Sequence, residues 1–561
     1  MVTVHPFGLR FTRLWRCRRQ PELSGRIFLF VGISACRLAG ISRQTKTFLC
    51  VLRASVVKVL FWTSTSSDVI EMDYDIIIGF ETHVELKTET KLFCDCAVSY
   101  DAPPNTSICP VCTGQPGALP VLNKRALQFT VRAGLALNCE INRRCRFARK
   151  NYFYPDLPKG YQISQYELPV CRNGHLEVAG DDGQPYAVGI KRVHLEEDAG
   201  KLIHSSSSLE GTRYSLVDYN RASVPLLEIV TDHERNPVRS IQEARAYLEK
   251  LRQVLKYIEI SDCIIEKGQF RCDVNVSLRP KGSRAYGNRA EVKNMASFRF
   301  IMDALEYEVK RQSDILESGD EVHQETRLFD EQRKITLPMR SKEDAPDYRY
   351  FPDPDLVEIE LDLDFVNKIR KRMPELPDQK VARLVEAYGI PKSDVLILTK
   401  ERGVSDYFTA CAEICEDRKK LSRWIIKELF KLLNKDCVSI EKCPIIPDDF
   451  SRLIDLVSRG EITEKMGRAI LEEMFERRVG PDAIITEKGL EPIHDIHALE
   501  KFVDAVLEEH PEVVAKVKQG DRKPVDYLIG QVMRKTHGKA KPMEVGELVK
   551  KKILGALTND K

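Results

Sequence analysis

Residues 78–86 have the sequence IGFETHVEL, in which apolar and polar side chains alternate. Side chains two positions apart in a β-strand share a face of the sheet. The stretch therefore predicts a strand with an apolar face for a core and a polar face that carries Glu81, His83 and Glu85. One strand of this kind is most often a solvated sheet face.

Two later stretches repeat the alternation and also place reactive groups on the polar face. These polar rows are Arg192, His194, Glu196 and Asp198 within residues 190–198, and Arg271, Asp273, Asn275 and Ser277 within residues 270–278. Crowded carboxylates cannot all ionise at neutral pH unless a cation lies among them, because like charges raise each other's pKa. Mg²⁺ prefers oxygen ligands and bridges to substrate phosphates. The three rows together therefore indicate metal-assisted phosphate chemistry.

The overall composition sets limits on the class of protein. A chain of 561 residues is long enough for roughly three or four domains. Its 87 basic and 84 acidic residues nearly balance, so any contact with nucleic acid must be local. The 16 cysteines are dispersed, unlike the dense disulfide framework of a small secreted domain, which favours a reducing compartment.

Residues 1–70 differ in composition from everything that follows. Arginine is frequent there and Glu22 is the single acid before residue 68, among many Ser, Thr and apolar residues. This bias is typical of an organelle transit peptide, and we favour the mitochondrial matrix. The apolar runs are too short or too charged to span a bilayer, which needs about 20 apolar residues, so no membrane partner is expected. The alternative is that these residues are not translated, because Met72 stands just before the first strand and could be the true start.

The remaining sequence predicts an α+β protein. Residues 71–365 are rich in strand patterns and predict an antiparallel-sheet-rich domain, with one helix over residues 297–317 after a Ser start. From residue 366 the pattern becomes helical, with apolar stripes at residues 421–433 and, after a Thr cap, at residues 463–475. We expect a helical linker domain over residues 366–430 and an all-α tail domain over residues 431–561.

Two close pairs of cysteines predict a structural zinc site. The ligands would be Cys94, Cys96, Cys109 and Cys112, enough thiolates for one tetrahedral Zn²⁺. The second pair, C-x-x-C with Pro110 inside it, resembles a zinc knuckle, whereas the C-x-C pair is tighter than usual. A zinc ion here would hold its loop beside Glu81 and His83. Buried or redox-active thiols remain the alternative.

Residues 149–162 interleave basic and aromatic side chains between two prolines. Such a segment suits the single-stranded end of a nucleic acid, where bases stack on rings and phosphates meet Lys or Arg. The alternative is a Pro-rich loop that packs its tyrosines under a sheet.

The residues named so far fall within longer motifs that carry a family resemblance. These are DYNRASVPLLEI at 218–229, PNT at 104–106 leading to LPVLN at 119–123, HLEEDAG at 194–200, RCDVNVS at 271–277, and MRSKE at 339–343 leading to DYRYFP at 347–352. The chain from about residue 73 resembles the B subunit of the glutamyl-tRNA(Gln) amidotransferase, also called the aspartyl/glutamyl-tRNA amidotransferase. Ser223 departs from the pattern, since the family more often has Gly there.

The resemblance implies a ligase that acts in protein biosynthesis. In that family ATP phosphorylates the γ-carboxylate of glutamate misattached to tRNA(Gln), and ammonia then displaces phosphate to give Gln-tRNA(Gln). Residues 71–365 would be the catalytic cradle. The implied roles are metal or phosphate binding for Glu81, His83, Glu196 and Glu197, ATP binding for Arg271, Asp273 and Asn275, and contact with the tRNA terminus or activated glutamate for Lys150 and Tyr152.

Absent motifs imply partners for this chemistry. The sequence has no G-x-x-x-x-G-K-[ST] loop, so ATP would be held by the sheet face. It also lacks an amidase signature and a G-x-S-x-G elbow. Glutamine hydrolysis would then belong to a separate amidase, the A subunit, in a heterotrimer with a small partner similar to the family's C subunit. Residues 530–542, with the basic run 550–552, resemble the tail domain that contacts tRNA, although a solvated basic face is the plainer explanation.

Two other classes of protein stay open at this point. The chain could be a zinc-bearing RNA-binding or assembly protein without catalysis, in which case Glu196→Gln would leave its activity intact. It could also be a stand-alone ATP-dependent ligase that uses free ammonia and works without an amidase partner.

Overall fold

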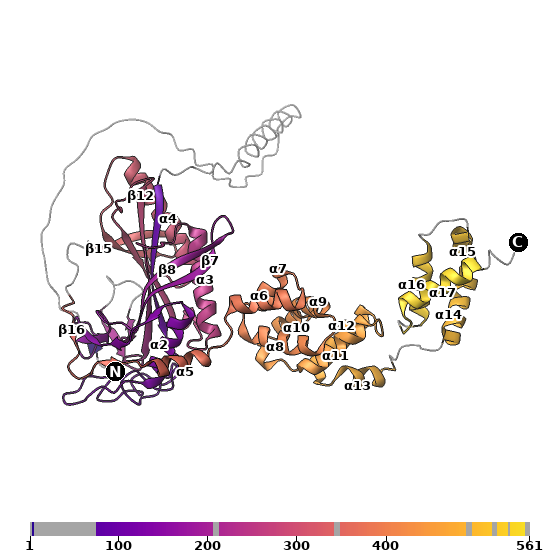
Figure 1. Cartoon of the computed structure of the whole chain (residues 1–561), viewed down its shortest axis with the longest axis horizontal. Coiled ribbons are helices and arrows are strands. Elements are labelled where there is room, and N and C mark those ends of the chain that lie inside the picture. The colour runs from indigo at the N-terminus through magenta and orange to yellow at the C-terminus, as the bar shows by residue number, and fades with distance from the viewer. Residues whose placement is uncertain are drawn as a thin grey trace, which may run out of the picture.

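The computed structural model describes residues 3–4, 74–205, 213–341, 348–489, 496–518, 524–536 and 539–555. The predicted leader over residues 1–70 lies outside the described residues, apart from positions 3–4, and so do residues 342–347 of one family motif. Three bodies follow one another along the described chain (Figure 1). Each has a separate hydrophobic core, formed within residues 78–369, 384–485 and 499–553.

A mixed sheet of nine described strands organises the first body. All neighbours in it pair antiparallel except β13 and β14, which are parallel. The strands, in spatial order, are β15 (Ile335–Ser341), β14 (Glu325–Asp330), β13 (Ala290–Lys293), β12 (Phe270–Pro280), β2 (Tyr74–Glu85), β11 (Pro225–Thr231), β8 (Pro185–Glu197), β7 (Cys171–Ala179) and β3 (Glu140–Ile141).

Helices cover the apolar face of this sheet (Figure 1). They are α2 (Lys124–Ala136), α3 (Ile241–Tyr257) and α4 (Phe298–Glu317). Phe80 of β2 stacks on the fully buried Tyr247 of α3, with ring centroids 5.4 Å apart. The expected helix after Ser297 is confirmed, since the Ser297 hydroxyl caps it by accepting from the Phe300 amide at 3.1 Å. The apolar rows of the sequence therefore face the core, and the polar rows lie on the opposite face of the sheet, where several of their members are also buried.

Smaller elements surround the large sheet. A short 3-10 helix, η1 (Ile265–Lys267), precedes β12, and α5 (Leu363–Lys371) ends the domain. Three small sheets have the strand orders β1-β10-β9, β16-β5-β6 and β17-β4. Their strands are β1 (Thr3–Val4), β10 (Ser215–Asp218) and β9 (Lys201–His204); β16 (Phe351–Pro352), β5 (Ala148–Asn151) and β6 (Tyr161–Ser164); β17 (Ile359–Glu360) and β4 (Arg144–Cys145).

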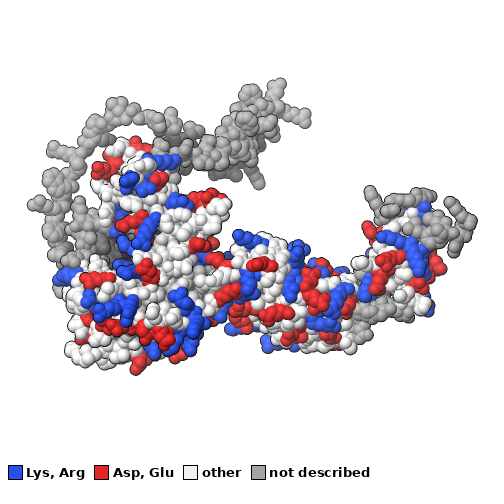
Figure 2. Space-filling view, in the orientation of Figure 1, with Lys and Arg blue, Asp and Glu red and all other residues white. Residues whose placement is uncertain are grey.

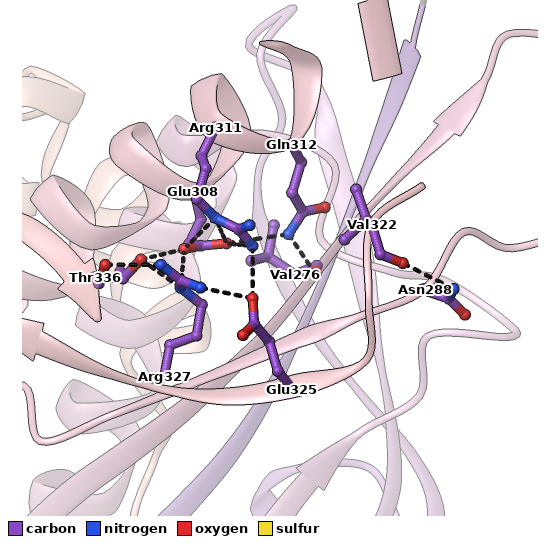
Figure 3. Close-up of polar contacts among 9 residues, drawn as sticks. All are labelled: Val276, Asn288, Glu308, Arg311, Gln312, Val322, Glu325, Arg327 and Thr336. Atoms are coloured by element: carbon purple, nitrogen blue, oxygen red, sulfur yellow. Dashed lines mark hydrogen bonds and ion pairs between the residues drawn. The ribbon is translucent and has the colours of Figure 1, made fainter. Parts of the chain in front are cut away.

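A buried ion-pair network fastens α4 to the far edge of the sheet (Figure 3). The carboxylate of Glu308, which is fully buried, meets Arg311 at 2.8 Å and Arg327 at 2.9 Å. It also accepts hydrogen bonds from the Thr336 hydroxyl and from the Gln312 amide. Burial alone would raise the pKa of Glu308, but these donors outweigh it and lower the pKa.

The second body is all helical, and its extent differs from the expected linker domain. Its core runs from Leu384 to Ile485. The boundary expected at residue 430 falls inside one continuous helical rod, formed by α9 (Arg418–Trp424), a π-helical turn η3 (Ile425–Leu429) and α10 (Phe430–Lys435). The apolar side chains of this rod pack against helices that precede it in the sequence and against helices that follow it. No domain boundary therefore forms at residue 430.

The other elements of this body precede and follow the rod. Thr463 caps its helix by accepting from the Met466 amide at 3.3 Å, as its pattern predicts. The elements are α6 (Pro377–Tyr388), α7 (Lys392–Leu398), α8 (Arg402–Ile414), η4 (Ile440–Lys442), α11 (Pro447–Ser458), α12 (Glu464–Arg477) and α13 (Pro481–Glu487).

The third body is a small helical tail with its own core. It comprises α14 (Ile496–Glu509), α15 (Pro511–Lys518), α16 (Pro524–Lys535) and α17 (Pro542–Gly555). The expected α+β architecture, a sheet-rich domain followed by helical domains, is thus confirmed. Within the described chain, no helix is both long and apolar enough to cross a membrane.

The network around Glu308 predicts a large stability effect. Glu308→Ala removes the buried carboxylate that Arg311 and Arg327 share, and leaves Glu325 as the remaining carboxylate beside Arg327. Breaking a buried pair of this kind costs about 3–5 kcal/mol. Urea unfolding of the first body should show this loss in free energy. Arg333→Ala is the control, since it removes a mostly exposed partner that lies 3.9 Å from Asp330, and it should cost under about 1 kcal/mol. Equal effects of the two substitutions would contradict this account.

Candidate functional site

Strand register brings the three polar rows onto one surface. Glu228 of β11 lies directly opposite His83 of β2 on one side and His194 of β8 on the other. Arg271 of β12 continues the line beyond His83. Four neighbouring strands therefore present one reactive side chain each in a single row across the sheet.

Two imidazoles and two carboxylates meet at the centre of this row. The Nε2 atom of His194 lies 3.2 Å from the Glu228 carboxylate, and that of His83 lies 3.5 Å from it. Glu196 lies 3.8 Å from His83 and 3.7 Å from His194. One ligand atom each from His83, Glu196 and Glu228 lie within 4.8 Å of one another, close enough to hold one divalent cation.

The charges of these groups depend on one another. Burial alone would lower the pKa of His83, but the carboxylates of Glu228, Glu196 and Asp273 outweigh it and raise the pKa to about 9. Burial would likewise raise the pKa of Glu228, yet His194 and His83 hold it well below its usual range. The carboxylates of Glu196 and Glu228 are thus ready to bind a cation. The cation would take the place of the protons on the imidazoles.

A cavity of about 620 Å³ lies over this cluster. Most of the residues predicted from the sequence line it together: Glu81, His83, Lys150, Tyr152, Glu196, Arg271 and Asp273. Asn275 donates to Glu81 at 3.1 Å but lines an adjoining cavity of about 210 Å³. Glu81 and Asp273 lie beside the His83 cluster. Among the described residues, the group spaced closely enough to hold a metal ion comprises His83, Glu196 and Glu228.

Lys150 and Tyr152 reach the cavity from a different sheet. Lys150 belongs to β5, which pairs with β6, and β6 in turn packs on β8. Burial alone would lower the pKa of Lys150, but Glu196 and Glu228 raise it. The Lys150 ammonium lies 4.9 Å from the ring centre of Tyr348, whose ring packs edge-on against Tyr152. The cavity thus has a cationic and aromatic wall facing its acidic floor.

Glu197 does not reach the cavity, contrary to the role that the resemblance implied. Successive side chains of a strand point to opposite faces, so Glu196 and Glu197 cannot both face the site. The Glu197 carboxylate instead accepts from Lys159, from the Ile163 amide at 2.8 Å and from the Ser223 hydroxyl at 2.5 Å. It therefore holds the segment around Lys159 against β8. Ser223 has φ +70°, a left-handed conformation that favours Gly.

The four predicted zinc ligands form a second cluster. One Sγ atom each of Cys94, Cys96, Cys109 and Cys112 lie within 4.8 Å of one another. A hydrogen bond from Cys94 lowers the pKa of Cys112 to about 4, helped by the charge of Lys91. Lys91 is fully buried, with its ammonium 3.6 Å from the Cys112 sulfur. This geometry could hold a tetrahedral metal ion.

The loop of the cysteine cluster is fastened to the segment that leads into β11. Asn105 accepts from the Tyr219 amide at 2.8 Å and donates its side-chain amide to the Val217 carbonyl at 3.0 Å. Lys91 also donates to the Tyr219 carbonyl at 3.2 Å. The loop follows β2, the strand of Glu81 and His83, and its anchor is the turn before β11, the strand of Glu228.

Several parts of the site were not predicted from the sequence, among them Arg289, Glu291 and Lys293, which line the cavity at and just before β13. Glu228 received no role, although a lone acid within the apolar run 224–230 was a usable signal. Tyr348 and Tyr350 also line the cavity, and they lie within one of the family motifs.

Comparison with known proteins identifies the family of this chain. Residues 76–367 match the model of the GatB/GatE catalytic domain, and residues 406–553 match that of the GatB domain. Three relatives are named as the B subunit of an aspartyl/glutamyl-tRNA(Asn/Gln) amidotransferase. The protein of Carboxydothermus hydrogenoformans is 48% identical, over 86% of this chain and 99% of its own length.

The other two relatives are similar to the chain to nearly the same degree. The protein of Thermodesulfovibrio yellowstonii is 47% identical, over 85% of this chain and 99% of its own length. That of Moorella thermoacetica is 47% identical, over 86% of this chain and 100% of its own length. The chain therefore belongs to the family of amidotransferase B subunits that contain the GatB/GatE catalytic domain.

Proposed function

We propose that this chain is the kinase and transamidase subunit that converts Glu-tRNA(Gln) to Gln-tRNA(Gln) in mitochondrial translation, with ATP as phosphoryl donor. The observation that carries the proposal is the cluster of His83, Glu196 and Glu228 under Lys150 in one cavity. Family membership supports a tRNA-dependent amidotransferase. The Arg-rich composition of residues 1–70 supports the mitochondrial matrix.

The cluster fits a divalent cation. Glu196 and Glu228 would supply carboxylate oxygens, which suit Mg²⁺, and His83 would supply an imidazole, a ligand more common for transition metals. When bound, such a cation neutralises charge on the transferring phosphoryl group. His194 contacts both carboxylates and orients them toward the cavity.

The two chemical steps balance as a phosphorylation and a displacement. An oxygen of the glutamyl γ-carboxylate attacks the γ-phosphorus of ATP, the bond from phosphorus to ADP breaks, and ADP leaves. Ammonia then attacks the γ-carbon, phosphate leaves with the bonding electrons, and loss of a proton gives the amide. Lys150, charged and facing the acidic floor, neutralises negative charge on the carboxylate and phosphate oxygens. Arg271, paired with Asp198 at 3.0 Å, borders the same space.

Ammonia would come from a partner. The chain lacks the amidase signature and the G-x-S-x-G elbow. The word subunit in the relatives' names supports an assembly of several chains. We therefore assign glutamine hydrolysis to an amidase, the A subunit, held with this chain and a small C-like partner in a heterotrimer.

Reconstitution tests the catalytic assignment. With the partner chains, Glu-tRNA(Gln), ATP and glutamine, the wild-type chain should form Gln-tRNA(Gln). Glu228→Gln removes one of two carboxylates from the proposed cation site and should lower kcat about a hundredfold or more, as loss of a key electrostatic group does. Glu177→Gln, in an exposed position of β7, is the matched control. Full activity of Glu228→Gln or Glu196→Gln would favour a non-catalytic RNA-binding role, and activity without the amidase partner on glutamine would contradict the assembly.

The tail body is proposed to hold the tRNA. Arg534, Lys550 and Lys551 are exposed on α16 and α17. Figure 2 shows acidic and basic side chains intermixed over the visible helical surface, so a local contact is required. Deleting residues 496–561 removes one separate core. We expect at least tenfold weaker tRNA binding, with ATP binding unchanged.

Point substitutions refine the tail test. Alanine at Arg534, Lys550 and Lys551 should weaken tRNA binding and reduce its dependence on salt, because fewer phosphates are neutralised. Alanine at Lys427, Lys431 and Lys435, three positions of the helical rod with exposed side chains, is the charge-matched control. Equal effects of both triple variants would remove the tail from the tRNA contact.

Zinc in the cysteine cluster is a separate proposal. Four thiols at this spacing suit structural Zn²⁺, and the ammonium of Lys91 would offset part of the negative charge of four thiolates. We expect one zinc per chain by elemental analysis of protein purified without chelator. Cys112→Ser should lose that metal, whereas Cys437→Ser, at an exposed cysteine outside the cluster, should keep it. Absence of stoichiometric zinc from the wild-type protein would refute the proposal.

A further inference from the structure

The first and second bodies meet where two helices end. The carbonyl of Thr399, at the C-terminal end of α7, accepts hydrogen bonds from the Tyr257 hydroxyl at 2.5 Å and from the Gln253 side-chain amide at 2.9 Å. In return, Arg402 of α8 donates to the carbonyl of Tyr257, the last residue of α3, at 3.1 Å. The last carbonyls of a helix have no partner within that helix. Each body therefore supplies donors to a helix end of the other body.

The residues of α3 that reach the second body share one face of the helix. Lys250, Gln253 and Tyr257 are three and four positions apart, a spacing that places them on the same side. Leu251 and Leu255 of the same helix belong to the hydrophobic core of the first body. The helix α3 thus packs on the sheet with one face and contacts the second body with another.

The contact is narrow, because an open cavity of about 1010 Å³ lies beside it and is lined by residues of both bodies. Two ion pairs, Lys250–Asp378 and Lys256–Glu401, join the bodies there, and the carboxylates of both pairs are at least half exposed. Exposed pairs of this kind contribute little. By contrast, the hydrogen bond from hydroxyl to carbonyl joins two residues that are each 1% exposed. Loss of its donor would leave a buried carbonyl short of a partner, which is costly.

We propose that Gln253, Tyr257, Thr399 and Arg402 form a helix-end latch that positions tRNA for catalysis by fixing the second body on the first. The proposal rests on the proposed tRNA contact of the tail body. The second body stands between the catalytic domain and the tail along the chain (Figure 1), so its angle sets where the acceptor end of a tail-bound tRNA lies. Two linked sites reinforce each other only when their connection allows both to be occupied at once. The four latch residues do not line the catalytic cavity, so they are positioning residues.

Substrates of two lengths test the latch. Tyr257→Phe combined with Gln253→Met removes both side-chain donors to the Thr399 carbonyl with little change in volume. In the reconstituted complex, kcat/KM for Glu-tRNA(Gln) should fall about tenfold or more, because linkage of two sites contributes factors of this size. A short acceptor-stem helix charged with glutamate lacks the tRNA body that the tail would hold, so its kcat/KM should not change. X-ray scattering by the full chain should show a wider spread of overall dimensions for the double variant than for the wild type.

The same helix offers a matched control, Tyr247→Phe combined with Gln242→Met. The Tyr247 hydroxyl is buried and has no hydrogen-bond partner among the described residues, and the Gln242 side chain is exposed. The control makes the same two chemical changes in α3 without touching the latch. It should leave both kcat/KM values and the scattering as they are in the wild type.

The remaining outcomes contradict the latch in different ways. Equal losses on both substrates would mean that the contact only maintains the catalytic domain, and would overturn the proposal. Unchanged kcat/KM for Glu-tRNA(Gln), or unchanged scattering, would overturn it too. A wild-type chain that uses both substrates equally well would refute the tRNA contact of the tail, and the latch with it, while transamidation stands. Failure of the wild-type complex to form Gln-tRNA(Gln) would instead refute the proposed function.

A second variant covers the case in which the double variant does not fold by circular dichroism. Arg402→Met removes the reciprocal hydrogen bond from the side of the second body and leaves both donors to Thr399 in place. It carries the same expectations for the two substrates and for the scattering.

Discussion

The register of β11 between β2 and β8 is the constraint on which the rest of the site depends. It sets Glu228 opposite both His83 and His194, and thereby brings two imidazoles and two carboxylates within a few ångströms. A slip of one residue would turn Glu228 into the core and an apolar side chain into the cavity. The packing of the apolar face against α2, α3 and α4 prevents that slip, so the hydrophobic core and the site enforce each other.

The site is assembled by elements that surround the sheet as well as by the sheet itself. Glu197, on the face opposite Glu196, holds the segment around Lys159 and so supports the small sheet that presents Lys150. The cysteine cluster is fastened through Lys91 and Asn105 to the turn that enters β11. Groups that never touch the cavity thus determine which side chains do.

Long-range charge contributes little to the design of this molecule. Basic and acidic side chains nearly balance over the chain, and Figure 2 shows both signs intermixed on the visible face. The strong fields lie inside the cavity, where the half-buried Lys150 and Arg271 face the buried carboxylates of Glu196, Glu228 and Asp198. In such a place charges interact far more strongly than on the surface. This arrangement suits chemistry on phosphate and carboxylate groups without a dedicated phosphate-binding loop.

The sequence alone determined the faces of the strands, the caps at Ser297 and Thr463, and the α+β class, because these depend on local periodicity and neighbouring backbone groups. Motif resemblance added the family and most of the cavity residues. Only the tertiary structure decided that Glu228 completes the cluster, that Glu197 turns away, and that the helical rod crosses the expected boundary at residue 430. Strand register and helix packing join residues far apart in the chain, and no local pattern specifies those contacts.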